Sequence, residues 1–237
     1  MHIAVRSFQQ TTWAQRLFLV VAGCNIALML VGIYIVPSAV TSLSGVGSLL
    51  GAICMQLVLA ALTLAGPVSF QRYRSSIGIS FALGGVFALL YLGDIIVDFN
   101  GGSDPINIIG IFLGVAGVAG FAACLRTRQW HQGVIAAIWA PVIGTAIWSI
   151  GLMLLYYRTW GSHQLYLFFQ GAGTIDDFHR SGETNLPVFL IHDMQGAFFF
   201  HPLLSIVLGA IGGLVSSSVA WGILLFRRSL FVRQEHG

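Results

Sequence analysis

Apolar residues are arranged along this chain in six long runs separated by shorter polar stretches. The runs cover residues 17–36, 46–66, 76–99, 106–125, 133–157 and 203–226. Each is roughly 20 to 25 residues long, the length that an α-helix needs to cross a hydrocarbon core of about 30 Å. The pattern therefore predicts an all-α integral membrane protein with six transmembrane helices.

The longest polar interval separates the fifth apolar run from the sixth. The predicted organisation is an arm (1–16), spans 1 to 5 (17–157), an extracytoplasmic segment (158–202), span 6 (203–226) and a tail (227–237). Late in the polar segment, Asn185 and Pro187 suit a helix start, and a mostly apolar stretch follows. Because this stretch of about 14 residues is too short to span, we expect a short interfacial or re-entrant helix that ends at Pro202.

The charged residues indicate an orientation in the membrane. Only 8% of the residues are charged, against about 25% in a typical soluble domain. All 11 basic residues are arginines, and nine of them fall in the arm, the tail and the second and fourth connections. Positive residues concentrate on the cytoplasmic side, so we expect both termini in the cytoplasm and the chain in an inner or plasma membrane.

The same residue types limit partners and cofactors. The arginines occur singly or in pairs at the ends of apolar runs, which indicates anchoring in a lipid bilayer and excludes a nucleic-acid-binding face. The chain has no lysine, which excludes a cofactor held as a Schiff base. The six runs as bounded here contain no histidine, so an intramembrane haem with two histidine ligands is not expected. Other cofactors remain open.

The sequence predicts a candidate polar pocket at the outer membrane face. Asp94 lies four or five residues inside the outer end of the third run, and Asp98 follows one helical turn later. His192, Asp193 and His201 belong to the short helix expected at the same depth. Histidine and carboxylate side chains in one pocket can bind a metal or transfer protons.

Two smaller groups of polar residues allow two interpretations each. Asp176, His179 and Glu183 are spaced i, i+3, i+7, so on a helix they would lie on one face and could together bind a metal ion. The alternative is that they belong to a solvated acidic loop. Asn25 and Gln56 lie near the middle of the first and second spans. They contact a substrate or ion, or they bond to each other and stabilise helix packing by roughly 0.6 to 2 kcal/mol.

Glycines in the spans permit close helix packing, either within the bundle or with another subunit or a second copy of the chain. They include the pair Gly110 and Gly114 and, in the sixth run, Gly209, Gly212 and Gly213. The chain contains no HExxH, Walker A, GxSxG, GxGxxG or CxxC motif, so catalysis remains open. We expect a small transporter or channel component or an accessory subunit of a membrane complex. The alternative is a membrane enzyme or metal-binding protein that uses the outer His and carboxylate site.

Overall fold

The computed structural model describes residues 13–65, 74–97 and 105–234, and in these ranges the chain is helical throughout, without a strand. The elements are α2 (Trp13–Ile35), the 3-10 helix η1 (Pro37–Val40), α3 (Leu43–Ala65), α5 (Arg74–Val97), α6 (Pro105–Thr127), α7 (Trp130–Arg158), α8 (His163–Gly171), α9 (Thr174–Ser181) and α10 (Leu186–Gln234). Of these, α2, α3, α5, α6, α7 and α10 are long and apolar enough to cross a membrane. The predicted all-α membrane protein with six spans is confirmed.

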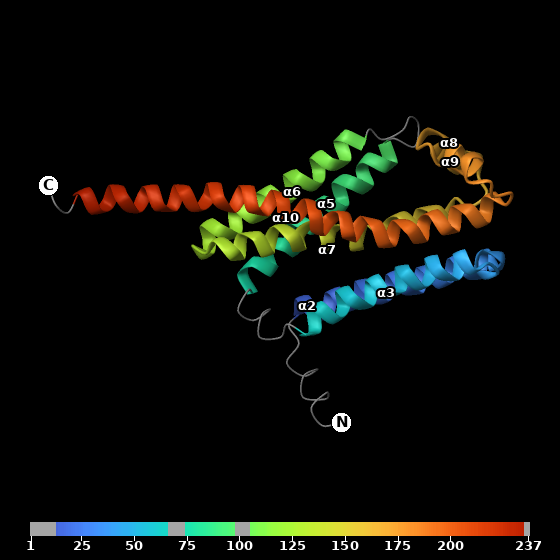
Figure 1. Ribbon diagram of the computed structural model, residues 1–237, viewed down its shortest axis with the longest axis horizontal. Coiled ribbons are helices and arrows are strands. Elements are labelled where there is room, and N and C mark those ends of the chain that lie inside the picture. Colours follow the sequence, from blue (N-terminus) through green and yellow to red (C-terminus); the bar gives the residue numbers. More distant parts are fainter. Residues whose placement is uncertain (1–12, 66–73, 98–104, 235–237) are drawn as a thin grey trace, which may run out of the picture.

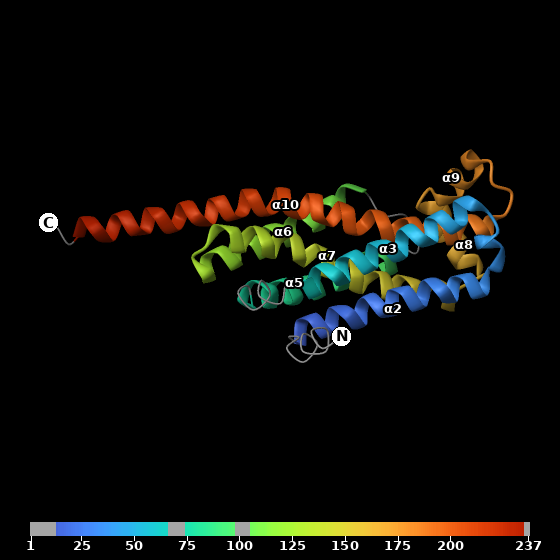
Figure 2. The same cartoon turned by 60° about the horizontal axis from the view of Figure 1, so that its bottom comes forward.

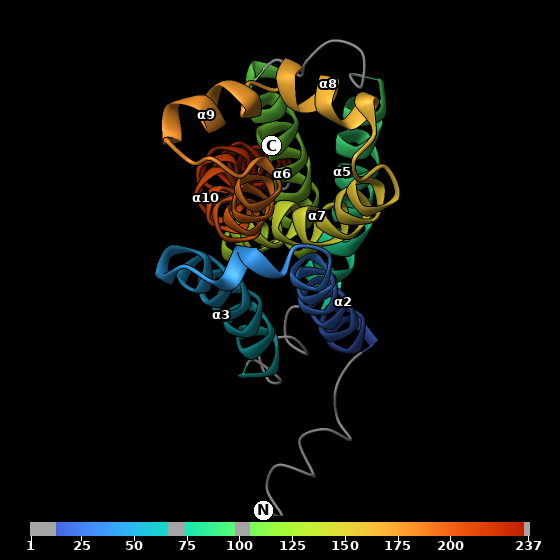
Figure 3. The ribbon, with the colours of Figure 1, turned by 90° about the vertical axis from the view of Figure 1, so that its right-hand side faces the viewer.

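Helix α7 is the centre of the bundle. It packs against α5, α6 and α10, and on a further side it contacts α2. Helices α2 and α3 form a hairpin closed by η1, and Figure 3 shows this hairpin on the side of α7 and α10 that faces away from α6. The elements α8 and α9 lie together at one end of the bundle, which we call the α8–α9 end (Figures 1 and 2).

Glycine allows the central helices to approach closely. A Cβ atom on Gly84 of α5 would lie 2.8 Å from the carbonyl oxygen of Ala140 in α7, and one on Gly209 of α10 would lie 2.8 Å from that of Ala137. Lipid supplies no hydrophobic drive for helix association, so packing between small residues takes its place. By contrast, a Cβ on Gly110 or Gly114 would meet open space.

Helix α10 begins where the sequence predicts a helix but does not end at Pro202. The side-chain oxygen of Asn185 accepts a hydrogen bond of 3.2 Å from the backbone N–H of Val188, and Pro187 lies in the first turn. The helix then continues through Pro202 to Gln234, and Figure 1 shows one long rod. A proline removes one backbone hydrogen bond and need not end a helix that is packed on both sides of it. The expected short helix is therefore the first part of the sixth span.

The two short helices α8 and α9 have local signals at their ends. The hydroxyl of Ser162 accepts a 3.2 Å hydrogen bond from the backbone N–H of Leu165 and caps α8. Gly173 and Gly182 have φ angles of 80° and 74°, and they bound α9 on each side. These left-handed conformations suit glycine and change the chain direction there.

Candidate functional site

Three of the five residues of the predicted outer pocket have described side chains, and these three do not share one set of contacts. Asp98 lies outside the described residues, and Asp94 is described only as a backbone position in α5. Nε2 of His192 lies 2.6 Å from the carbonyl oxygen of Ala39, so this ring links α10 to η1. Asp193 and His201 instead lie against α7. The structure therefore separates His192 from Asp193 and His201.

His201 belongs to a stack of three rings from three helices. The ring centroids of Trp148 in α7 and His201 lie 4.9 Å apart with an interplanar angle of 11°, and those of Trp148 and Tyr91 in α5 lie 4.5 Å apart at 16°. Both Nδ1 of His201 and Nε1 of Trp148 are buried, and neither has a hydrogen-bond partner in the described part of the chain. The stack thus places two polar nitrogens inside the bundle.

Between this stack and the α8–α9 end lies a small cavity of about 40 Å³. Helix α7 contributes Trp148 and Tyr156 to its lining, and α10 contributes Asp193 and Phe198. Tyr156 and Phe198 are buried, whereas Asp193 is exposed. The cavity wall therefore combines three aromatic rings and one carboxylate with aliphatic side chains.

Hydroxyl groups continue the polar contacts along α10 away from this cavity. The hydroxyls of Thr145 in α7 and Ser205 in α10 lie 3.2 Å apart. Further along, Ser216 lies against Gly120 of α6, and Ser217 lies against Gly133 of α7. Their hydroxyls are buried, and within the described ranges they have no hydrogen-bond partner.

We call this face of α10 the α10 seam. It consists of Asp193, His201, Ser205, Gly209, Gly213, Ser216 and Ser217, with the facing residues of α6 and α7. From Asp193 to Ser217 the helix rises about 36 Å at 1.5 Å per residue, comparable with the thickness of a bilayer core. Polar groups therefore occur near both ends and in the middle of one helix interface.

The midspan residues Asn25 and Gln56 are both fully buried and contact each other. Nδ2 of Asn25 lies 3.5 Å from Oε1 of Gln56, and it donates a shorter hydrogen bond of 3.0 Å to the carbonyl oxygen of Ala146 in α7. The hydrogen bond that the sequence suggested between the two amides is present. Together the contacts join α2, α3 and α7.

The candidate metal ligands on the short helices are arranged differently from the sequence-based expectation. Helix α9 ends at Ser181, and the left-handed Gly182 takes Glu183 out of the helical register of Asp176 and His179. Oε1 of Glu183 accepts hydrogen bonds from the backbone N–H groups of Thr184 (3.0 Å) and Asn185 (3.4 Å). No three His, Cys, Asp or Glu side chains in the described ranges are placed to hold one metal ion.

The neighbouring carboxylate of Asp177 forms an exposed ion pair with Arg180. The guanidinium of Arg180 donates a hydrogen bond to the Asp177 carboxylate, and this bond raises the pKa of Arg180 because it stabilises the charged form. Asp176 and His179 are exposed as well. The acidic part of α9 is thus a solvated helix face.

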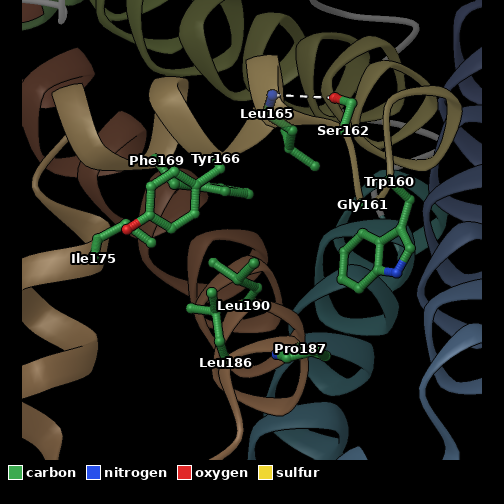
Figure 4. A pocket seen from close by; sticks show the side chains of 10 residues that line it. All are labelled: Trp160, Gly161, Ser162, Leu165, Tyr166, Phe169, Ile175, Leu186, Pro187 and Leu190. Atoms are coloured by element: carbon green, nitrogen blue, oxygen red, sulfur yellow. Dashed lines mark hydrogen bonds between the residues drawn. The ribbon is translucent and has the colours of Figure 1, made fainter.

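A larger pocket of about 240 Å³ lies where α8 and α9 meet the start of α10. Figure 4 shows Trp160 on one side, Tyr166 and Phe169 on the other, and Leu186 and Leu190 of α10 between them. None of the lining residues is charged. The pocket offers a largely apolar surface, in which Ser162 and Tyr166 carry the hydroxyl groups.

Sequence reasoning missed the importance of Tyr91, Trp148 and Tyr156. Tryptophan in membrane proteins is enriched at the two interfaces, whereas Trp148 lies ten residues inside the end of α7. A tryptophan so far inside a predicted span is the sequence signal that could have pointed to Trp148. His201 was placed outside the spans because a break was expected at Pro202, and the continuous α10 puts it inside the sixth apolar helix. No family model, curated protein or solved structure matches the chain.

Proposed function

We propose that this protein transports a small polar solute across the membrane along the α10 seam. Among the described residues, seven buried side-chain polar atoms have no hydrogen-bond partner, and the proposal rests on the four that lie along the seam: Nε1 of Trp148, Nδ1 of His201 and the hydroxyls of Ser216 and Ser217. The other three are Oδ1 of Asn25 and the two amide atoms of Gln195. A buried polar atom left unpaired costs about 1–3 kcal/mol. Polar side chains that persist inside a membrane despite such a cost are typical of a substrate or ion path.

The distribution of arginines supports a direction for this path. With both termini in the cytoplasm of an inner or plasma membrane, α8 and α9 face the outside. Asp193 then stands at the outer mouth of the seam, and Ser216 and Ser217 stand near its cytoplasmic end. A solute that enters beside Asp193 passes His201 about a third of the way along the seam.

The middle of the seam is closed in the described conformation. The hydroxyls of Thr145 and Ser205 lie 3.2 Å apart, and Gly209 of α10 approaches the backbone of α7 directly. Pro141 in α7 and Pro202 in α10 each remove one helical hydrogen bond close to this closed region. A small sliding or bending of α10 against α7 at the two prolines would open it.

The test is a permeability assay on the full chain in proteoliposomes. The probes are water, glycerol, urea and methylammonium, each compared with protein-free vesicles. At least one probe should cross faster with the protein. His201→Leu should reduce that flux at least about tenfold, because it removes the polar group that lies between the Asp193 mouth and the closed middle of the seam.

Ser80→Ala is the matched control for this experiment. The Ser80 hydroxyl is also buried between helices, where it donates to the carbonyl oxygen of Ala136, but it lies at the α5–α7 contact, away from the seam. Its flux should remain within about twofold of the native chain if the variant folds. Absence of protein-dependent flux for all four probes, in vesicles with correctly inserted protein, would refute the transport proposal.

The apolar pocket supports a second candidate function, that of an accessory subunit. Its lining of Trp160, Phe169 and Leu190 suits an apolar side chain of another membrane subunit. In that case Leu190→Asp should release the chain from a larger complex in its native membranes, as seen by native gel electrophoresis. An unchanged complex size in a folded Leu190→Asp variant would contradict this candidate.

A further inference from the structure

The cavity at the outer mouth of the α10 seam has a chemistry that the rest of the seam lacks. Its lining combines the carboxylate of Asp193 with three aromatic rings, those of Trp148, Tyr156 and Phe198. The relative exposures of these rings are 3%, 6% and 3%, so they are shielded from solvent, while Asp193 is exposed. The cavity wall therefore joins an exposed carboxylate to three buried rings.

A carboxylate beside aromatic rings favours a positively charged ligand. The face of an aromatic ring attracts a cation electrostatically, and the attraction grows when the site is shielded from water. Asp193 supplies the opposite charge. No basic side chain lines the cavity, so nothing in its wall opposes a cation.

The same lining disfavours metal cations. Calcium and magnesium take six or more oxygen ligands, and potassium filters surround the ion with carbonyl oxygens. Here the lining supplies side-chain oxygens from three residues, Asp193, Tyr156 and Ser149, which is fewer than such a shell requires. A monovalent cation that pairs with one carboxylate and otherwise contacts ring faces needs fewer oxygen ligands and fits better.

Volume limits the size of this ion. The cavity of about 40 Å³ is about three times the roughly 10–15 Å³ that suffices to hold one water molecule, so it has room for about three. It admits an ammonium ion or one bearing a single methyl group. A quaternary ammonium group such as that of choline is too large.

We infer that this cavity binds ammonium or a methylammonium ion. The inference deepens the proposed function and rests on it for its role, because it names the substrate class of the α10 seam. Asp193 pairs with the charge of the ion, and Trp148, Tyr156 and Phe198 replace part of its hydration shell. From this cavity the next polar group along the seam is His201.

Equilibrium binding tests the inference without any transport. Radiolabelled methylammonium is added to the purified full chain in detergent, with ammonium chloride, sodium chloride and choline chloride as competitors. Ammonium should displace the label, and sodium and choline should not do so at the same concentration. Asp193→Asn should weaken binding at least about tenfold, because the carboxamide keeps the size of the side chain and loses its charge.

Asp176→Asn is the matched control, since Asp176 is an exposed carboxylate at the same end of the molecule that does not line the cavity. Its affinity should stay within about twofold of the native chain. Trp148→Phe keeps a ring and should reduce affinity less than Trp148→Leu, for which a loss of roughly 3- to 30-fold is expected. Equal binding in the native and Asp193→Asn proteins, or displacement by choline as effective as by ammonium, would overturn the inference.

The binding and flux measurements together separate the two proposals. Seam-dependent flux of water, glycerol or urea without methylammonium binding leaves transport standing and refutes the cation site. Asp193-dependent binding without flux of any of the four probes leaves the cation site standing and refutes transport. Loss of both in folded protein refutes both.

Discussion

Polar side chains reach the central helix α7 from two sides, and they contact it in different ways. On the α2 side the contacts are hydrogen bonds: Nδ2 of Asn25 donates to the carbonyl oxygen of Ala146 at 3.0 Å, and the hydroxyl of Tyr157 donates to that of Leu28 at 2.7 Å. Of the Asn25 amide, only Oδ1 is left without a partner in the described residues. These side chains stabilise the position of α2.

On the α10 side the contact at His201 is ring against ring, and the Thr145 and Ser205 hydroxyls meet one turn further along. His201 stacks on Trp148, and the Nδ1 and Nε1 atoms of these rings remain unpaired within the described ranges. Stacking supplies packing energy but leaves the polar nitrogens available to another molecule. The difference indicates that burial of a polar residue in a span does not by itself mark a site; the absence of an internal partner is the more informative observation.

The substitution with the largest expected effect disrupts the close approach of α10 to α7. Gly209→Ala should reduce the unfolding free energy by about 1–3 kcal/mol, because the added methyl group would lie 2.8 Å from the carbonyl oxygen of Ala137. The measurement is unfolding in mixed micelles followed by circular dichroism. Gly222→Ala, on the same helix with nothing within 4 Å of its Cβ, should be neutral or slightly stabilising. Equal losses for both variants would show that α10 does not pack on α7 in this way.

A second pair of variants tests the comparison itself. Asn25→Leu should lower the unfolding free energy by about 0.6–2 kcal/mol, because it removes the hydrogen bond to Ala146. Its flux should not change if it folds. His201→Leu should show the opposite pattern, with flux lost and the unfolding free energy within about 1 kcal/mol of native, since the lost Nδ1 atom had no partner. Similar patterns for the two variants would remove the distinction between the two sides of α7.

The sequence predicted the six spans and the contact between Asn25 and Gln56 because both depend on position along the helix axis. Length and hydropathy define a span, and two amides at similar depth in neighbouring helices are placed to meet. The cap by Asn185 was also predictable, since it is a local property of the chain.

The candidate site was less predictable because depth does not specify the rotation of a helix. His192 and Asp193 are adjacent in sequence, but adjacent residues on an α-helix project about 100° apart. One therefore contacts η1 and the other lines the cavity against α7. The continuity of α10 through Pro202 and the turn at Gly182 depend on packing and on a backbone angle, neither of which the hydropathy pattern contains.

A smaller effect tests the other hydrogen bond on the α2 side. Tyr157→Phe should lower the unfolding free energy by about 0.5–1.5 kcal/mol, because it removes only the hydroxyl that donates to the carbonyl oxygen of Leu28. Tyr166→Phe is the control, since Tyr166 is an exposed residue of α8 and should change stability little. A neutral Tyr157→Phe would mean that Asn25 alone fixes α2 against α7.

The smallest expected effect is that of a substitution at Gln56, which tests which of the two hydrogen bonds of Asn25 is the stronger. Its Oε1 lies 3.5 Å from Nδ2 of Asn25, at the limit of hydrogen bonding, whereas the bond from Asn25 to Ala146 is 3.0 Å. Gln56→Leu should therefore cost less than Asn25→Leu, at about 0.5 kcal/mol or below, and the same unfolding measurement compares them. If Gln56→Leu costs more than Asn25→Leu, the contact between α2 and α3 is the stronger of the two, and α2 is held by its hairpin partner more than by α7.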